Sequence, residues 1–503
     1  MQLVVRFPNR RRVPSEPRSL WLQQTLAGES CARGRPLHGQ VEADVCIVGG
    51  GFTGLWTALD LKRREPSARV VIVEADICGG GASGRNGGFV MTWWSKFPSL
   101  LKLCGPEVAL QLAERAAAAV DAIGSFCDEH DIDAGFRQGG WLWTATSRAQ
   151  VDAWDETLDA LAAAGATPFA EMTSAEIAER AGSPVHLAGV YDPKAAIVQP
   201  AALARGMARV AADQGVEIYE HSAVSEIREG VRMTVRTRDG TVTAGRVVLA
   251  LNAWAAALPE VRRALVVVAS DIVVTEPVPE RLAATGWAPD LAVSDSRRLV
   301  NYYRQSADDR VVFGKGGGTL AMRGRVGPEF DRESSRADEV RAHLTRSYPS
   351  LWDVATTASW RGPIDYSVTG LPFFARLEAS PGILVGAGFS GNGVGPSYLA
   401  GQVLASLALD DPDHGWPAGL TRIPRSRLPP EPLRYGGGLL VRAAVARKED
   451  AEDLGHAPSL LLRAVAQLDP TGFVDRGNGI ATGQPNGSGP ARQASSDRMS
   501  AHR

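Results

Sequence analysis

Cysteine is scarce in this sequence of 503 residues and is confined to its first quarter. The five cysteines show no C-x-x-C spacing: Cys31, Cys46, Cys78, Cys104 and Cys127. An odd, clustered set of this kind argues against a disulfide framework. The opening stretch MQLVVRFPNRRRVPSEP has an arginine cluster but no apolar region followed by a small-residue cleavage site, so we expect no secretory signal. These observations together predict reduced thiols and a cytoplasmic protein.

Metal-ligand spacing, long apolar runs and an excess of one charge are also missing. None of the eight histidines lies three or four residues from another, so no metal site is expected. No apolar run is long enough to span a bilayer. The formal net charge is −2, and no run of lysine or arginine is interleaved with aromatics, which argues against nucleic acid as a partner. The composition is ordinary for a globular protein, and the chain is long enough for two or more domains.

The first strong pattern that is present is a strand, a glycine turn, a helix and a second strand. Residues 45–48 form a short apolar run, and FTGLWTALDLKRR after the glycines has helical periodicity. RVVIVE, Arg69 to Glu74, then reads as a β-branched strand. This order predicts a parallel βαβ unit with a right-handed crossover.

The glycines of this unit fit the dinucleotide-binding pattern G-x-G-x-x-G. Gly49 permits the tight turn, Gly51 lets backbone approach a pyrophosphate, and Gly54 lets helix and strand pack closely. The helix N-terminus would face the phosphates with unpaired N–H groups. Glu74 ends the second strand twenty residues beyond Gly54, where a carboxylate accepts hydrogen bonds from ribose hydroxyls. The unit therefore predicts a dinucleotide site.

A second glycine-rich stretch, CGGGASGRNGG, runs from Cys78 to Gly88. Its composition alone fits a linker, a turn or a loop shaped around a ligand. Its place directly after Glu74 favours a loop moulded to the dinucleotide, with Ser83, Arg85 and Asn86 as polar contacts.

The rest of the chain alternates between helical and strand patterns. We expect helices near 105–128, 148–164 and 200–213, and strands near 139–146, 231–237, 241–250, 298–304, 310–314 and 356–361. Asp239-Gly240 predicts a tight hairpin between two of these strands. Gly382 to Leu409 reads as a second strand, glycine loop and helix. Two nucleotide-type segments thus enclose β-rich material.

With these motifs in place, the chain resembles the FAD-dependent oxidoreductases of the D-amino-acid-oxidase superfamily. Within it, the glycine/sarcosine-oxidase-like and γ-glutamylputrescine-oxidase-like enzymes are the most similar. The resemblance runs from about Leu20 to Pro470 and rests on the order of six motifs: G-x-G-x-x-G with Glu74, GASGRNGG, VVLALNAWA, NYYR...VVFGKGGG, WRGPIDYSVTGLPFFA and GAGFSGNGVGPSYLAG.

The resemblance implies an α/β fold with an α+β insert: a Rossmann-like FAD-binding domain built from discontinuous segments, and an inserted substrate domain rich in β-sheet. We expect an N-terminal extension (1–40), an FAD-binding domain (41–105, 185–255 and 360–410), a substrate domain (106–184 and 256–359), a helical extension (411–468) and a disordered tail (469–503).

The resemblance also implies which residues hold FAD. The ADP half would be held by Gly49, Gly51, Gly54 and Glu74. The pyrophosphate and flavin would be lined by Ser83, Arg85, Asn86, Gly87 and Gly88. Backbone donors to the flavin's polar edge would come from Gly386, Gly388, Gly391, Asn392, Gly393 and Val394.

The chain departs from the family pattern at two places. It reads GNG where many relatives have GHG, so Asn392 has no titrating ring. No cysteine follows Cys127, so the C-terminal cysteinyl–flavin bond of monomeric sarcosine oxidases cannot form. The loop position where some relatives carry a flavin-linking histidine has none. We therefore expect non-covalent FAD.

The family chemistry implied is oxidation of an amine or amino acid, with hydride passing from the α-carbon to flavin N5 and the imine hydrolysed to an aldehyde or keto acid. Oxygen or another acceptor would reoxidise the flavin. Two alternatives remain: an FAD-dependent dehydrogenase of a hydroxy acid or another C–H donor, and a flavin-binding subunit without turnover. Neither the substrate nor the oligomeric state follows from the sequence.

Candidate catalytic residues are less certain than cofactor contacts, because each has a structural explanation as well. Tyr302, Tyr303 and Arg304 would border the substrate face of the flavin, or pack within a sheet. Lys315 in FGKGGG would bind an anionic group or assist oxygen chemistry, or lie in a solvated turn. Arg361 is a candidate for binding a carboxylate. The tandem Trp93-Trp94 would wall the pocket or belong to the core.

Overall fold

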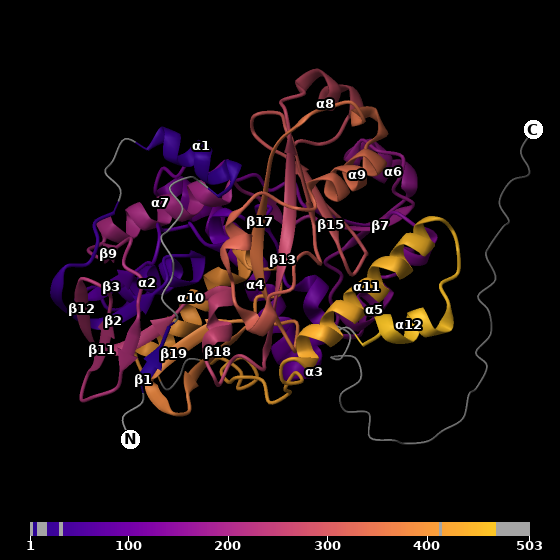
Figure 1. Ribbon diagram of the computed structural model, residues 1–503. Coiled ribbons are helices and arrows are strands. Elements are labelled where there is room, and N and C mark those ends of the chain that lie inside the picture. Colours follow the sequence, from indigo (N-terminus) through magenta and orange to yellow (C-terminus); the bar gives the residue numbers. More distant parts are fainter. Residues whose placement is uncertain (1–3, 8–17, 30–33, 412–414, 469–503) are drawn as a thin grey trace, which may run out of the picture.

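The computed structural model of the protein describes residues 4–7, 18–29, 34–411 and 415–468 (Figure 1). The expected disordered tail, 469–503, lies outside these residues. Two large sheets form the framework, one of nine strands and one of eight, and a two-stranded ribbon joins β4 (Phe89–Val90) to β8 (Ala196–Ile197). Within the described residues, no helix is long and apolar enough to cross a membrane.

The nine-stranded sheet contains the βαβ unit expected from the glycine pattern. β2 (Gly39–Val48), α2 (Phe52–Arg64) and β3 (Val70–Val73) follow in order, and β2 pairs with β3 in parallel, with Ile47 opposite Ile72. β9 (Glu217–Tyr219) extends this parallel part beyond β3.

One strand, β12 (Gly240–Leu249), joins the separate parts of this sheet. It pairs in parallel with β2 along its length. Its first half also pairs with β11 (Met233–Arg236) in the hairpin predicted from Asp239-Gly240. Its last residues pair in parallel with β19 (Ser380–Ala387), where Val248 lies opposite Leu384. The two glycine-rich units, far apart in the sequence, therefore share one sheet, which confirms the expected α/β fold.

The remaining strands of this sheet lie outside the parallel core. They are β1 (Val4–Arg6), β10 (Glu226–Arg228) and β18 (Phe373–Leu377). Helices α2, α4 (Pro106–Glu129), α7 (Pro200–Asp213) and α10 (Val394–Ala408) pack on one face through a large apolar cluster. Side chains alternate across strands, so Ile47 and Ile72 meet these helices, while Cys46 and Val71 face the opposite cluster.

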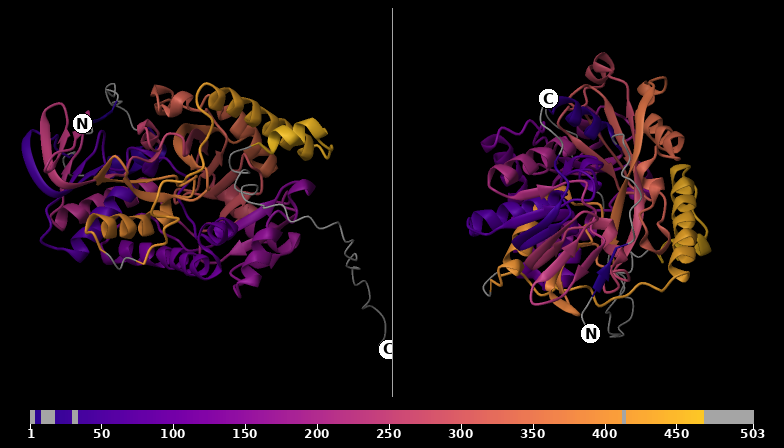
Figure 2. Two further views of the ribbon diagram at one scale, coloured as in Figure 1. Left: turned by 90° about the horizontal axis from the view of Figure 1, so that it is seen from below. Right: turned by 60° about the vertical axis from the view of Figure 1, so that its left-hand side comes forward.

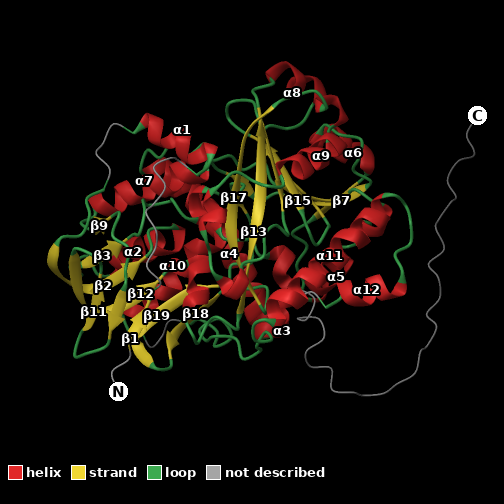
Figure 3. Ribbon diagram, viewed as in Figure 1, coloured by secondary structure: helices red, strands yellow, loops and turns green. Residues whose placement is uncertain are grey.

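The eight-stranded sheet has the order β17-β13-β16-β15-β14-β5-β7-β6. Its two longest strands, β13 (Leu265–Thr275) and β17 (Thr356–Ser367), run antiparallel at the centre of the molecule (Figure 3). The others are β16 (Val311–Lys315), β15 (Asn301–Gln305), β14 (Ala292–Asp295), β5 (Trp141–Ala145), β7 (Ala188–Asp192) and β6 (Ala170–Met172). Helices α6 (Ser174–Ala181), α8 (Pro279–Thr285) and α9 (Ala337–Ser347) pack on one face of it.

The structure differs from the expected division of the chain at three places, and one is β17, whose residues 360–367 lie in the eight-stranded sheet although 360–410 was expected in the FAD-binding domain. β7 belongs to the eight-stranded sheet, where Val190 lies opposite Trp143, although 185–255 was expected in the FAD-binding domain. α4 was expected in the substrate domain, but its face of small residues, including Ala113 and Ala116, is buried in the cluster of α2 and α10. Tertiary packing, which no local pattern reveals, decides all three positions.

Three further α-helices are α1 (Leu20–Gly28), α3 (Phe97–Cys104) and α5 (Asp155–Ala163), and α1 packs on α7. Two helices near the C-terminal end of the described chain, α11 (Leu433–Asp453) and α12 (Leu460–Ala466), lie on the outside of the molecule (Figure 2).

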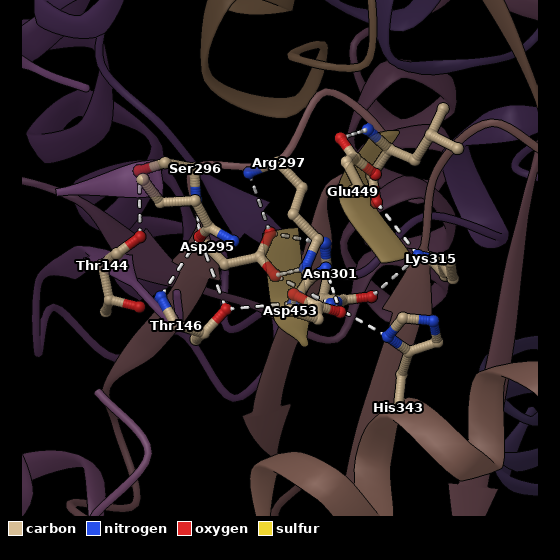
Figure 4. A network of polar contacts seen from close by, with 12 residues as sticks. Thr144, Thr146, Asp295, Ser296, Arg297, Asn301, Lys315, His343, Glu449 and Asp453 are labelled. Carbon is tan, nitrogen blue, oxygen red and sulfur yellow. Dashed lines mark hydrogen bonds and ion pairs between the residues drawn. The ribbon is translucent and has the colours of Figure 1, made fainter. Parts of the chain in front are cut away.

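A buried polar network holds α11 against the loop that precedes β15 (Figure 4). Asp453 accepts hydrogen bonds from Arg297 at 2.8 and 2.6 Å, and Arg346 adds a third at 2.5 Å. Glu449 accepts from the backbone N–H groups of Arg298 and Leu299 at 2.8 and 3.2 Å. Burial raises the pKa of Glu449 to about 7. Helix attachment thus depends on charged groups as well as on apolar contact.

We predict that Asp453→Asn loosens α11 without unfolding the sheets. The substitution leaves Arg297 short of one charged partner, and removing one member of a buried pair costs about 3–5 kcal/mol. Hydrogen exchange should therefore become faster in residues 433–453 and stay unchanged in β2 and β12. Asp450→Asn on the exposed side of the same helix is the control, and equal protection in both variants would contradict the assignment.

Candidate active site

A cavity of about 1530 Å³ lies between the two sheets. The nine-stranded sheet contributes the turn after β2, the end of β3 and the loops 80–87 and 389–394. The eight-stranded sheet contributes Trp141, Ser270, Ser294, Tyr302 and residues 362–366. Both glycine-rich segments and the substrate-side strands therefore face one space.

The turn between β2 and α2 has the geometry that the glycine pattern requires. Gly49 has a φ of 114°, a conformation that other residues rarely adopt. A side chain on Gly54 would overlap the carbonyl of Gly49, so helix and strand approach closely. Gly51 precedes the helix, and a Cβ there would lie 2.8 Å from the Ser83 hydroxyl. The first turn of α2 consequently opens on the cavity.

Glu74 lies in the cavity wall at the end of β3. Its Oε2 accepts a hydrogen bond from the Gly50 N–H at 2.7 Å, and its Oε1 accepts from the Asp76 N–H at 2.8 Å. The carboxylate is therefore held in place by backbone donors, beside the position expected for a ribose.

The second glycine-rich stretch is an ordered loop tied to the first. Ser83 accepts a hydrogen bond from the Phe52 N–H at 2.9 Å and so satisfies a donor in the first turn of α2. Asn86 braces the loop from within: its amide donates to the Ser83 carbonyl at 2.8 Å and accepts from the Gly88 N–H at 2.7 Å. Its side chain is thus occupied by the loop itself.

Arg85 also acts within the protein, although it lies in the cavity wall. The buried guanidinium donates to the carbonyls of Gly80 and Phe330 at 3.0–3.1 and 2.9 Å, and to Asp331 at 2.9 Å. Burial and the nearby Arg18 lower the pKa of Arg85 to about 10. Its contacts fasten the loop to the segment before α9.

The C-terminal glycine loop is anchored by a buried acid that sequence reasoning did not single out. Asp365 lies in the cavity wall and accepts from the Gly388 N–H at 2.6 Å and from the Asn252 amide at 3.1 Å. Burial raises its pKa to about 7, and these hydrogen bonds oppose the rise. Asp365 thus joins the loop to the NAW motif that follows β12.

Asn392, which stands where many relatives have histidine, donates to the Thr92 carbonyl at 3.2 Å. Its Oδ1 and that of Asn252 are buried and accept no hydrogen bond from any described residue. Both side chains lie in the cavity wall. Buried acceptors without donors are costly, so these two amides are suited to contact a polar ligand.

The residues present fit FAD. Two helices, α2 and α10, begin at the cavity wall, and the N–H groups of their first turns, apart from that of Phe52, which donates to Ser83, suit a pyrophosphate and the electron-rich edge of a flavin. Glu74 suits the ribose. Gly391, Asn392, Gly393 and Val394 line the wall at the start of α10.

Of the expected cofactor contacts, four glycines do not line the cavity. Gly54 and Gly386 serve packing between helix and strand, and Gly388 gives its N–H to Asp365. Gly88 lies against the Val198 carbonyl. These four glycines support the conformation of the loops and do not face the cavity.

Among the expected catalytic residues, only Tyr302 reaches the cavity. Its ring lies between Gly87 and Gly314, meets Phe89 edge to face at 5.8 Å, and its hydroxyl is 2.8 Å from Ser270 Oγ. Burial raises the pKa of this hydroxyl, so it stays protonated.

The structure places the other four catalytic candidates outside the cavity wall. Tyr303 points to the opposite face of β15 and stacks on Phe313. Arg304 is buried behind the glycine loop and donates to the carbonyls of Gly87 and Val198.

Lys315 lies in the network beneath α11, near Leu299 and Asn301 (Figure 4). Arg361 pairs with Asp271 at 3.1 Å. Trp93 and Trp94 belong to the core. In each case the side chain already has protein partners, which the residue type alone does not reveal.

Sequence reasoning also missed wall residues, of which some lie inside the motifs and others lie outside them. They are Phe89, Lys96, Trp141, Asn252, Trp254, Ser270, Asp365, Tyr366 and Phe389. The motifs VVLALNAWA and WRGPIDYSVTG contained several of them, but nothing local indicated which side chains face inward. No cluster of three or more potential metal ligands occurs in the described part of the chain.

Comparison with known proteins identifies the family. Residues 44–407 match the DAO family, described as FAD dependent oxidoreductase. The chain belongs to this family. The resemblance drawn from its motifs and the FAD cofactor are thereby confirmed, and the protein is an FAD-dependent oxidoreductase.

Individual relatives agree with this assignment. The chain is 30% identical to gamma-glutamylputrescine oxidoreductase of Escherichia coli over 77% of its own length and 91% of that protein. It is 28% identical to probable oxidoreductase OrdL of Haemophilus influenzae, over 75% and 85%. The crystal structure of glycine oxidase from Geobacillus kaustophilus superposes with a TM-score of 0.64 at 26% identity, covering 77% of this chain and 99% of that one.

We predict that this FAD-dependent oxidoreductase holds its cofactor without a covalent bond. None of the four described cysteines lines the cavity, and no histidine does so within the described residues. Acid precipitation of the purified holoenzyme should release all of the flavin as FAD into the supernatant. A yellow pellet would contradict this.

A second prediction concerns Asp365. Its raised pKa means that the folded protein keeps a proton that the unfolded chain, with an ordinary carboxyl pKa of about 3.9, has released. Its contribution to stability is therefore complete below about pH 4 and is lost as pH rises to about 7. Asp365→Asn removes this loss of stability at high pH, because the new side chain does not ionise. The Asn252 amide can rotate so that its oxygen accepts a hydrogen bond from the amide at position 365.

The measurement is the melting temperature of variant and wild type at pH 5 and pH 8, with excess FAD. The melting temperature of the variant relative to that of wild type should be higher at pH 8 than at pH 5. A difference independent of pH would show that Asp365 does not carry the linkage, and Asp450→Asn is the exposed control.

Proposed function

We propose that the protein oxidises the C–N bond of an amine or amino acid, giving an imine that water hydrolyses to an aldehyde or keto acid. FAD, when bound, supplies the acceptor for the hydride that leaves the α-carbon. The named relatives, a gamma-glutamylputrescine oxidoreductase and a glycine oxidase, support this substrate class. Oxygen or another acceptor would complete the cycle.

The observation that carries the proposal is the wall of the cavity on its substrate side. Phe89, Met91, Trp141, Tyr302 and Phe389 give it a largely apolar and aromatic lining. An apolar wall disfavours an ammonium ion and so favours the neutral amine, whose lone pair assists departure of the hydride.

The polar groups of this region orient the substrate. The Tyr302 hydroxyl, held by Ser270, can donate to or accept from a substrate atom without ionising. Asp365 is buried and accepts hydrogen bonds from Gly388 and Asn252. It therefore positions the loop and does not serve as a proton acceptor for the substrate. No strong base is needed if the amine enters neutral.

The proposal predicts anaerobic bleaching of the flavin by amines. The yellow holoenzyme is mixed without oxygen with amines, N-methyl amino acids, polyamine conjugates and hydroxy acids, and flavin absorbance is followed. At least one amine or amino acid should bleach it. Bleaching by a hydroxy acid and by no amine would contradict the proposal.

A second measurement separates the possible acceptors. Hydrogen peroxide formed in air is compared with reduction of an artificial dye under anaerobic conditions.

Tyr302→Phe should lower turnover with the bleaching substrate while FAD content stays unchanged, because the hydroxyl is removed and the ring that fills the space is kept.

A further inference from the structure

Helices α11 and α12 carry most of the exposed leucines of the described chain. Thirteen large apolar side chains are exposed in the described residues, and seven of them are leucines of this segment: Leu433, Leu439, Leu440, Leu454, Leu460, Leu461 and Leu468. Both helices follow residues 44–407, which match the family, and they lie on the outside of the molecule (Figure 2). A single exposed leucine is ordinary, but a cluster of them marks a surface that contacts a partner.

The leucines of α11 repeat every seven residues on its outer face. Leu433, Leu440 and Leu454 are 69%, 62% and 72% exposed. The remaining position of this row is the exposed Arg447. A second row of exposed residues lies three positions further along the chain: Gly436, Ala443 and Asp450. Two rows with this offset form the a and d seam of a coiled coil, the surface by which one helix packs on another.

Glycines of this outer face have no explanation within one chain. Glycine is among the least favourable residues inside a helix, yet α11 contains Gly436, Gly437 and Gly438 in succession. A Cβ on Gly436 or Gly437 would meet no atom of the described chain within 4 Å outside its own helix. Packing inside the protein therefore does not require glycine at these two positions. A helix of another molecule can approach the backbone closely there.

The charges of the seam fit a second copy of the same chain as the partner. Arg447 and Asp450 are both exposed, and neither forms an ion pair with another described residue. When two α11 helices pack antiparallel about a twofold axis with Arg447 opposite Asp450 of the second copy, the reverse contact follows by symmetry. A parallel pair would place like charges together. A membrane surface would meet the charged Asp450 in the middle of the apolar face.

This antiparallel register also matches a large side chain with a small one. It places Leu454 of each copy opposite Ala443 of the other. Helix α12 packs beside α11, where its Ala466 joins Ala444 and Val445 in one buried cluster. The exposed leucines of α12 therefore adjoin the helix that carries the seam and extend its apolar surface.

We propose that the outer face of α11 and α12 is the interface of a homodimer, in which the two α11 helices pack antiparallel across a twofold axis. The leucines supply most of the binding free energy. The exposed Arg447–Asp450 pairs fix the register and add little affinity. This proposal concerns assembly and is independent of the proposed amine oxidation.

The test measures the mass of the purified holoenzyme by sedimentation equilibrium over a wide range of protein concentrations. Wild type should sediment with twice the mass of one chain. Leu440→Glu and Leu454→Glu each place a carboxylate in the apolar row of both copies, and each should raise the dimer Kd at least about tenfold, as expected for a central interface residue. The control is Val231→Glu, because Val231 is a fully exposed apolar residue in the loop between β10 and β11, and it should leave the Kd unchanged.

A charge exchange tests the antiparallel register. Arg447→Glu alone brings acids together at both ends of the paired seam and should weaken the dimer. Adding Asp450→Arg restores opposite charges and should return the Kd toward that of wild type. FAD content and the far-ultraviolet circular dichroism spectrum should match wild type in every variant, because all the substituted side chains are exposed.

Three results would overturn the proposal: a monomer at every concentration, a dimer Kd that Leu440→Glu and Leu454→Glu leave unchanged, or equal Kd values for wild type, Arg447→Glu and the charge exchange. A monomer that cosediments with vesicles of phosphatidylcholine and phosphatidylglycerol, and loses this binding in Leu440→Glu, would also overturn it and assign the face to a membrane surface.

Discussion

The hydrogen bond from the Phe52 N–H to Ser83 is the contact on which the arrangement of the site depends. It joins the glycine turn at the start of α2 to the glycine loop that follows β3. The loop is held from its other sides as well: Ser19 and Trp21 of the N-terminal segment donate to the carbonyls of Gly84 and Asn86, and Trp360 donates to that of Arg85. A stretch with the composition of a linker is thus a junction between both sheets. The glycines of the loop let neighbouring segments approach its backbone closely, and its polar side chains form hydrogen bonds that stabilise its conformation.

The elements of the FAD-binding part followed from the sequence because each carries a local signal. The tight turn needs glycine at 49, the close packing of α2 needs glycine at 54, and the ribose position needs an acid at 74. Pairing of β19 with β12 could be predicted only from the order of motifs, since 130 residues lie between Leu249 and Ser380. The placement of α4 and β7 could not be predicted from the sequence, because it depends on which other elements their apolar faces pack against.

The substrate side shows why residue type does not predict a catalytic role. Tyr302, Tyr303 and Arg304 are consecutive, and the pleat of β15 sends alternate side chains to opposite faces. Tyr302 faces the cavity, whereas Tyr303 enters the core. Arg304 shares a parity with Tyr302, yet its guanidinium reaches sideways to the Gly87 carbonyl. Sequence alone gives the alternation without the phase, and it does not show whether a long side chain is already committed to the protein.

The charges along the cavity follow a consistent physical logic. At the nucleotide side, helix N-termini and backbone N–H groups provide positive potential without burying free ions. Where the flavin's polar edge would lie, Asn252 and Asn392 offer neutral amides with unused acceptors, and burial raises the pKa of Asp365 to about 7, which disfavours its charged form. Neutral amides therefore meet the ligand here without adding a buried charge, whereas the charged side chains Arg18 and Arg85 elsewhere in the wall are paired with Asp76 and Asp331.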